Sequence, residues 1–344
     1  MKSDSENSIG ILDERYILMK NLGAGYSSQV YKVKDSLTNK IYAAKVFNNY
    51  TQSIEKEIEN NKIITENINT HFPHFIKYIT SSVGPFKLKN DSQGSDTPET
   101  KAYIIFELGT KGELLDYLTC TKENLDERFV KVIFIKLIKA VRYLHLIELC
   151  HRDLKTDNIV LSGEEFIIKL LDFGLSSKII KTKDGNVQYQ TEYVGTEEYA
   201  APEVLNGIPY DGEKADIFSL GVILFNLRTG LRGFKIAKCY DPKEVKDKSK
   251  LLYNYIRYKK YKIYWKKLGL NINVDDLSEQ FKKLYLKMVA YDPNERPTLG
   301  EIFNDDYFDD IRTLTNDQLH NLEQEIINEF RIREALIKES KNIT

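Results

Sequence analysis

The segment best equipped for chemistry is the run at residues 151–158, His-Arg-Asp-Leu-Lys-Thr-Asp-Asn. A carboxylate such as Asp153 can accept a proton from a hydroxyl group. Lys155 can neutralise an anionic group during its transfer, and the side-chain oxygen of Asn158 can hold a hard cation. A charged surface turn would have a similar composition, so this run alone does not establish a site.

A second oxygen ligand follows an apolar strand that we expect at residues 166–171. It is Asp172, in the sequence Asp-Phe-Gly. A hairpin between the two segments would bring Asp172 back beside Asn158. Two oxygen ligands at this separation make a charged turn a weak explanation for the pattern.

A candidate anion-binding lysine lies much nearer the beginning of the chain. Lys45 sits in the run Tyr-Ala-Ala-Lys-Val at residues 42–46, whose other members suit a buried strand. A lysine aimed inward requires an anion. Glu57 and Glu59, on the next expected helix, are the candidate partners.

A glycine-bearing turn precedes this strand. In the run at residues 23–28, Gly23 and Gly25 let the backbone approach phosphate oxygens closely, because glycine has no side chain and permits positive φ. The run departs from a full glycine triplet at Ser28. By itself it would indicate only a glycine hairpin.

The elements expected to position these groups fall into a strand-rich beginning and a helical remainder. β-type alternation marks residues 16–46, 75–80 and 102–107, while apolar residues at helical spacing mark residues 53–68, 129–146 and 216–228. Residues 84–100 are rich in Asn, Asp, Ser, Gly and Pro, and we expect a mobile surface insertion there.

The final segment is expected to be an amphipathic helix from Thr315 to about Ile337. Residues 315–318, Thr-Asn-Asp-Gln, form a capping-box pattern. One face carries the apolar residues Leu319, Leu322, Ile326, Phe330 and Ile337. Because so narrow a stripe cannot stabilise an isolated helix, we expect it to dock on the rest of the chain or on a partner.

Composition excludes several classes of protein. The 344 residues can bury a large core, and the formal net charge of −1 gives no overall field for nucleic acid or an anionic membrane. Cys120, Cys150 and Cys239 lack metal-ligand spacing and fit a reducing compartment. With no apolar run long enough for a membrane span, we expect a protein of the cytosol or nucleus that binds neither membrane nor nucleic acid.

In order and spacing, these segments resemble the signature motifs of eukaryotic protein kinases of the serine/threonine type, and loosely those of the calcium/calmodulin-dependent group. The resemblance implies an α+β fold of two lobes: an N-lobe with an antiparallel sheet and one helix, and a mainly helical C-lobe. The implied divisions are a flexible N-terminus (1–14), a kinase domain (15–308) with N-lobe 15–107, hinge 107–112 and C-lobe 113–308, and a C-terminal extension (309–344).

The resemblance also implies ATP and Mg²⁺ as cofactors and proteins as substrates. By it Asp153 is the catalytic base and Asn158 and Asp172 bind Mg²⁺. Lys45 binds ATP phosphates and pairs with the helix glutamate, for which we favour Glu57. Lys155 in the catalytic loop indicates transfer to serine or threonine. The residues expected to surround ATP are Leu22, Gly23, Gly25, Val30, Ala43, Lys45, Phe106, Glu107, Gly109 and Val160.

Four residues are expected to regulate the segment between Asp172 and Glu203: Arg152, Thr191, Glu192 and Thr196. Many relatives have a phosphorylated threonine three residues before the glycine matched by Gly195, whereas this chain has Glu192. A carboxylate there could pair with Arg152 and order the segment without phosphorylation, and the neighbouring Thr191 remains an alternative phosphosite.

Three further residues resemble structural positions of the family. Glu203 and Arg296 resemble its ion pair between the activation segment and the lower lobe, and Asp216 resembles the helix anchor of the catalytic loop. Two alternatives keep the same fold: a pseudokinase without turnover, and a kinase of small molecules. The catalytic set and the segment around Thr196 count against them.

Overall fold

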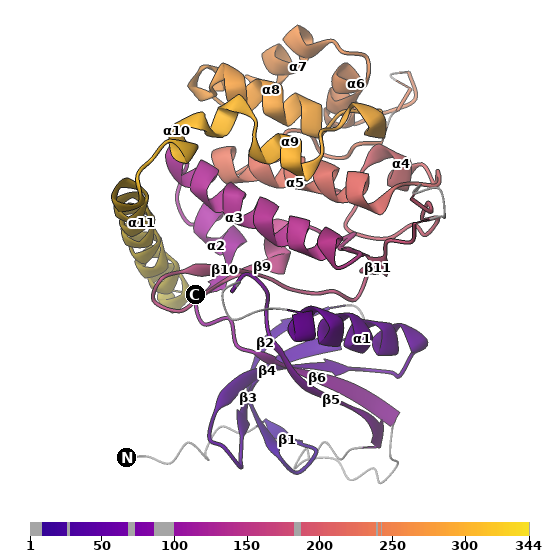
Figure 1. Ribbon diagram of the computed structural model, residues 1–344, viewed down its shortest axis with the longest axis vertical. Helices are drawn as coiled ribbons and strands as arrows, with labels where there is room; N and C mark the ends of the chain where they lie inside the picture. The colour runs from indigo at the N-terminus through magenta and orange to yellow at the C-terminus, as the bar shows by residue number, and fades with distance from the viewer. Residues whose placement is uncertain are drawn as a thin grey trace. The chain divides into compact units, whose positions relative to one another are not determined.

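A computed structural model of the chain describes residues 9–25, 28–67, 73–85, 100–181, 187–238, 240–241 and 243–343. The chain divides into two compact units, Met1–Thr110 and Lys111–Thr344 (Figure 1). This division falls inside the predicted hinge at residues 107–112. Of the three cysteines, Cys239 lies outside the described residues.

The first unit is a six-stranded antiparallel sheet with one helix, as predicted. The order across the sheet is β1-β2-β3-β4-β6-β5. Leu18, Val33, Ala44 and Ile105 form a fully buried cluster on one side, because alternate residues of a strand face the same way. The bounds are β1 (Gly10–Leu12), β2 (Tyr16–Ala24), β3 (Ser28–Asp35), β4 (Ile41–Phe47), α1 (Gln52–Asn67), β5 (Tyr78–Pro85) and β6 (Thr100–Glu107).

One boundary of this unit differs from the sequence-based expectation. The N-terminus was expected to be flexible through residue 14, but Gly10–Leu12 forms β1, which pairs with β2 and buries Leu12 completely. A three-residue strand has too little alternation to be recognised from sequence. The insertion predicted at 84–100 falls mostly on residues 86–99, which lie outside the described residues.

The second unit is mainly helical. Its helices are α2 (Leu114–Thr119), α3 (Glu127–Leu146), α4 (Pro202–Leu205), α5 (Gly212–Thr229), α6 (Leu252–Arg257), α7 (Tyr261–Leu268), α8 (Glu279–Met288), α9 (Leu299–Phe303), α10 (Asp309–Arg312) and α11 (Asn316–Ile343). Its short strands are β7 (Gly112–Glu113), β8 (Leu149–Cys150), β9 (Ile159–Ser162), β10 (Ile167–Leu170) and β11 (Ser177–Lys178). None of the described helices is long and apolar enough to cross a bilayer.

The two long apolar helices, α3 and α5, form the centre of this unit. Each begins at an aspartate cap: Asp126 accepts a hydrogen bond from the backbone N–H of Arg128, and Asp211 accepts one from Glu213. α5 ends at Gly230, whose φ of 66° suits glycine. Fifteen of the 18 residues of α5 are buried, which explains its nearly continuous apolar sequence.

The C-terminal helix α11 packs on the second unit, beside α2 and α3 (Figure 1). The capping box at its start is present, because Thr315 N donates to Gln318 Oε1 at 2.9 Å and Gln318 N donates to Thr315 Oγ1 at 3.3 Å. The Phe330 ring lies against those of Tyr117 and Phe166, with centroids 5.4 and 5.6 Å apart. The predicted apolar stripe of α11 therefore packs against other residues of the same chain.

A buried arginine on α11 was not anticipated from the sequence. Arg333 is 2 % exposed, and its guanidinium donates to the backbone carbonyl oxygens of Tyr117 at 2.8 Å and Glu123 at 3.0 Å. Glu329, one turn earlier, accepts a third bond at 2.6 Å. Arg333 thus completes the hydrogen bonding at the end of α2 while it anchors α11.

Replacing the aromatic anchor of α11 should destabilise the protein. Phe330 is 1 % exposed, so Phe330→Ala is expected to lower the free energy of unfolding by about 3 kcal/mol, measured by urea denaturation. Ile332→Ala is the matched control, because Ile332 is 60 % exposed on the same helix. Equal stability of the two variants would contradict the packing of α11.

Candidate active site

Lys45 lies on β4, opposite Val30 of β3 and Ile104 of β6. Its Nζ is 2.7 Å from Glu57 Oε1, and both side chains are mostly shielded from water, with exposures of 16 % and 7 %. Of the two glutamates that the sequence offered, Glu57 is the one paired with Lys45. The cationic head is therefore fixed by an anion on α1.

The remaining first-unit residues expected around ATP lie on neighbouring strands. Leu22 and Gly23 are on β2, Val30 on β3, Ala43 on β4, and Phe106 and Glu107 at the end of β6, with Gly109 just beyond. Leu22 is 45 % exposed, whereas Val30, Ala43 and Phe106 are half-buried. Val160 belongs to the second unit, on β9.

The glycine turn leaves space for a ligand without unusual backbone geometry. Neither Gly23 nor Gly25 has a positive φ, so the freedom of φ that we expected to matter is not used. A Cβ built on Gly23 would meet no atom within 4 Å, and one on Gly25 would touch only Ser28 at 3.7 Å. The space beside this backbone is open, as close approach of a phosphate requires.

Asp153 is the centre of the constellation in the second unit. Its Oδ1 accepts hydrogen bonds from Thr196 N at 2.8 Å and Thr196 Oγ1 at 2.7 Å. Lys155 Nζ lies 3.1 Å from Asp153 Oδ2 and donates to Thr196 Oγ1 at 2.8 Å. The carboxylate, the ammonium group and the hydroxyl thus form one closed network, in which Thr196 contacts both predicted catalytic groups.

Asn158 and Asp172 are brought together by the hairpin of β9 and β10. Leu171 N donates to Asn158 O at 2.9 Å, which places Asp172 one residue beyond this contact. Asn158 Nδ2 donates to Asp153 O at 2.9 Å and Asp153 Oδ2 at 3.2 Å. Because its nitrogen is used, the amide presents its oxygen as the atom available to a cation.

Asp216 holds the backbone of the loop that carries Asp153. It is completely buried at the start of α5, and it accepts hydrogen bonds from His151 N and Arg152 N, each at 2.8 Å. His145 Nε2 lies 2.9 Å from the same carboxylate. Arg152 has a φ of 65°, and the two backbone bonds to Asp216 stabilise that strained conformation.

Arg152 reaches from this loop into the activation segment. Its Nη1 lies 2.7 Å from Glu192 Oε2, and its Nε donates to Leu175 O at 2.7 Å. Burial lowers the pKa of Arg152, but Tyr210 and Glu192 raise it, and the net shift is upward. The guanidinium is therefore a fixed cation that joins the start of the segment, at Leu175, to its interior, at Glu192. Thr191 is exposed beside it.

Gly195 sits where no other residue fits. Its φ is 94°, and a Cβ there would lie 2.5 Å from the backbone oxygen of Arg152. This close approach lets the next residue, Thr196, reach Asp153. The glycine therefore sets the distance between the activation segment and the loop that carries Asp153.

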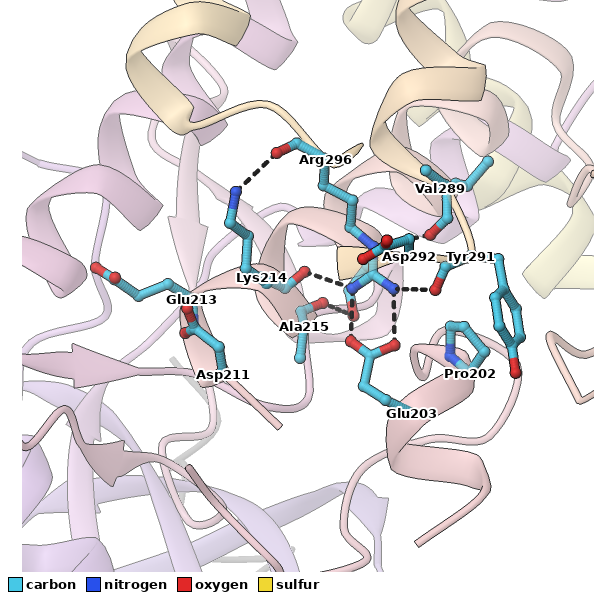
Figure 2. Close-up of polar contacts among 12 residues, drawn as sticks. Pro202, Glu203, Asp211, Glu213, Lys214, Ala215, Val289, Tyr291, Asp292 and Arg296 are labelled. Atoms are coloured by element: carbon cyan, nitrogen blue, oxygen red, sulfur yellow. Dashed lines mark hydrogen bonds and ion pairs between the residues drawn. The ribbon is translucent and has the colours of Figure 1, made fainter. Parts of the chain in front are cut away.

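The end of the activation segment is fixed by a buried ion pair. Arg296 Nη1 and Nη2 lie 2.6 and 2.7 Å from the two oxygens of Glu203 (Figure 2). The guanidinium also donates to the carbonyl oxygens of Ala290 and Lys214, each at 2.9 Å. These bonds satisfy a charge that would otherwise be costly to bury, so the pair fixes Glu203 to α5 and to the loop after α8.

The sequence matches the protein kinase domain family over residues 16–308. Testis-specific serine/threonine-protein kinase 2 of Mus musculus is 34 % identical over 215 residues, covering 62 % of this chain and 56 % of that protein. The SNF-related serine/threonine-protein kinase of Homo sapiens is 35 % identical over 206 residues, covering 60 % of this chain and 24 % of that protein.

A more extensive but more distant match is serine/threonine-protein kinase SAPK3 of Oryza sativa, which is 28 % identical over 305 residues. This match covers 86 % of the chain and 78 % of the rice protein. The chain spans 56 % or less of the length of the two mammalian proteins. The predicted resemblance to the kinase family and its two-lobed fold is confirmed.

Breaking the Glu203–Arg296 pair should strongly destabilise the second unit. Glu203→Ala leaves a buried guanidinium without its counter-ion, so we expect a loss of about 3–5 kcal/mol in the free energy of unfolding. Lys259→Ala is the control, because Lys259 is 61 % exposed in its ion pair with Glu295, and its loss should cost under about 1 kcal/mol. Similar urea midpoints for the two variants would contradict the role given to Glu203.

Proposed function

The chain belongs to the protein kinase family, and from this premise we propose that it is a serine/threonine protein kinase. It would transfer the γ-phosphate of ATP to hydroxyl groups of protein substrates. The observation that carries this proposal is the network in which Asp153 and Lys155 both contact Thr196. The similar proteins named above are serine/threonine-protein kinases, which supports the same reaction.

The residues fit a nucleotide bound with Mg²⁺. Mg²⁺ is usually held by one or two protein carboxylates together with substrate phosphates and water, rather than by an all-protein cage. Asp172 supplies a carboxylate, and the orientation of Asn158 leaves its amide oxygen available. Mg²⁺ would neutralise phosphate charge there, while Lys45, fixed by Glu57, would bind the α- and β-phosphates.

The residues of the catalytic loop act on the substrate hydroxyl and on the transferred phosphoryl group. Asp153 orients the substrate hydroxyl and accepts its proton, and Lys155 stabilises negative charge on the transferred group. The Thr196 hydroxyl bonds to both the Asp153 carboxylate and the Lys155 ammonium group, and it thereby fixes their relative positions. The expected adenine-binding residues, Val30, Ala43 and Val160, offer apolar side chains for the base.

A pseudokinase or a small-molecule kinase would share this fold. The presence of Lys45, Asp153, Asn158 and Asp172 argues against the first, because inactive relatives usually lack one of these groups. The contact between Thr196 and Asp153 argues against the second, because it ties the expected peptide-binding segment to the catalytic base. Phosphorylation of a sugar or an aminoglycoside, but of no peptide, would favour the second alternative.

Removing the base or a phosphate ligand should abolish transfer without unfolding the protein. Asp153→Asn, Lys45→Met and Asp172→Asn are each expected to lower kcat by about 100-fold or more, because transfer depends on positioning and charge neutralisation. Incorporation of labelled phosphate from Mg-ATP into a generic protein substrate measures this. Lys136→Met on α3 is the control, and full activity of a folded Asp153→Asn protein would refute the assignment.

We propose further that Glu192 orders the activation segment without phosphorylation. Its pair with Arg152, at 2.7 Å, supports this role. A carboxylate carries one charge, whereas a phosphate carries about 1.5 to 2 and offers more acceptor oxygens. The Glu192 side chain is also 57 % exposed, so the pair is weaker than a buried one. Glu192 should therefore give substantial but incomplete order.

Protein made in bacteria and treated with phosphatase should accordingly be active. Glu192→Ala should lower its kcat by about tenfold, because Arg152 loses its anion, while Glu197→Ala in the same segment should change little. Initial rates on a peptide substrate compare these proteins. An inert dephosphorylated protein that regains activity on phosphorylation of Thr191 would contradict the role of Glu192.

A further inference from the structure

A groove of about 800 Å³ lies on the second unit, and its lining residues are not those of the network around Asp153. It runs between the segment after α5, the start of α6 and the end of α7. Its floor is apolar, with Phe234 and Leu268 each 3 % exposed, and half-buried Leu252, Tyr255 and Ile272 line its sides. This floor would accept aliphatic side chains.

The rim of the groove is cationic. Arg232, Lys235, Lys248 and Lys267 line it, and no lining residue is acidic. Nearby acids offset part of this charge, since Lys235 Nζ lies 3.0 Å from Asp247 and Arg232 Nη1 lies 3.9 Å from Glu198. Within the described residues, Lys267 has no ion-pair partner.

The positive charge extends along the chain that builds the groove. Between Lys248 and Val274 the sequence has eight lysines and arginines and no acidic residue. The formal charge of the whole chain is only −1, so this segment is a local concentration of one sign. Such a surface attracts acidic segments and repels basic ones.

Exposed apolar side chains stand at the same edge. Leu270 is 80 % exposed and Leu231 is 48 % exposed, and both line the groove. A single exposed leucine is common on protein surfaces. Here two exposed leucines lie beside an apolar floor and a cationic rim. A surface with apolar anchor sites and a polar border is typical of peptide-binding sites.

The groove adjoins the segment that contacts the catalytic base. The Arg232 guanidinium lies 5.9 Å from the centre of the Tyr199 ring and 3.9 Å from Glu198. Tyr199 and Glu198 follow Thr196, which donates to Asp153. A polypeptide in the groove would therefore lie beside the loop expected to receive the substrate.

We propose that this groove docks an extended, acidic segment of the protein substrate, outside the phosphorylated site, whose aliphatic side chains enter the apolar floor. This inference rests on the proposed kinase function in one respect, which is that the docked segment belongs to a kinase substrate. The C-terminal helix is not the occupant, because α11 packs beside α2 and α3. The one aromatic ring of the floor, Phe234, is only 3 % exposed and offers little open face for a stacked base, which favours a peptide over a nucleic acid.

Binding can be tested without catalysis. The probe is a fluorescein-labelled peptide with leucine at every third position and glutamates between, measured by fluorescence anisotropy with the full chain. Lys248→Glu/Lys267→Glu and Leu270→Ser are each expected to weaken its binding, by about tenfold for the double variant. Lys260→Glu/Lys262→Glu, equal in charge and outside the lining, should bind like the wild type.

Several outcomes would overturn the docking site. These are no binding by the wild type, equal binding after Lys248→Glu/Lys267→Glu, or equal binding of a peptide with serine in place of leucine. Tighter binding of a labelled single-stranded oligonucleotide would also overturn it. So would a dimer, seen by sedimentation, that excludes the peptide and is lost in the double variant.

A steady-state kinetic experiment tests the docking site separately from the proposed function. A generic serine peptide is fused to the acidic segment through a flexible linker and compared with the unfused peptide. Fusion should lower KM at least tenfold at unchanged kcat in the wild type and in Lys260→Glu/Lys262→Glu, but not in Lys248→Glu/Lys267→Glu. Peptide binding without any phosphate transfer would refute the kinase function, but it would not contradict the role of the groove as a peptide-docking site.

Discussion

The buried carboxylate of Asp216 is the constraint on which the second unit depends. A buried carboxylate is costly unless its oxygens are hydrogen-bonded, and here the backbone N–H groups of His151 and Arg152 satisfy them. Those bonds hold Arg152 at a φ of 65°, a conformation that a free loop would rarely adopt. The turn that follows aims Asp153 at Thr196, so the geometry of the network around Asp153 depends on α5.

Several contacts of the candidate site could be predicted, because its motifs follow one another in a fixed order along the chain. Lys45 was recognisable as a cation in an apolar strand, and Asn158 and Asp172 by their spacing across a hairpin. The choice between Glu57 and Glu59 was harder, because both lie on one helix and only packing decides which faces the sheet. Glu57 is 5 % exposed, and that burial directs it to Lys45.

Other features had no local sequence signal. Arg333 reads as one more charge on an amphipathic helix, and only the fold brings it to the carbonyl oxygens of Tyr117 and Glu123. The need for Gly195 likewise depends on a backbone oxygen more than forty residues away in the chain, that of Arg152. Long-range partners of this kind cannot be inferred from periodicity, because hydrophobic patterns identify faces and not the groups opposite them.

The C-terminal helix α11 packs on the hairpin that carries the candidate metal ligands. Phe330 of α11 packs on Phe166, which directly precedes β10, and β10 leads to Asp172. The opposite strand of that hairpin, β9, begins directly after Asn158. The hairpin is therefore supported at its turn by α11 and carries both candidate ligands at its other end. Since a packed aromatic contact resists displacement, docking of α11 restricts the motion of the strands that position both oxygens.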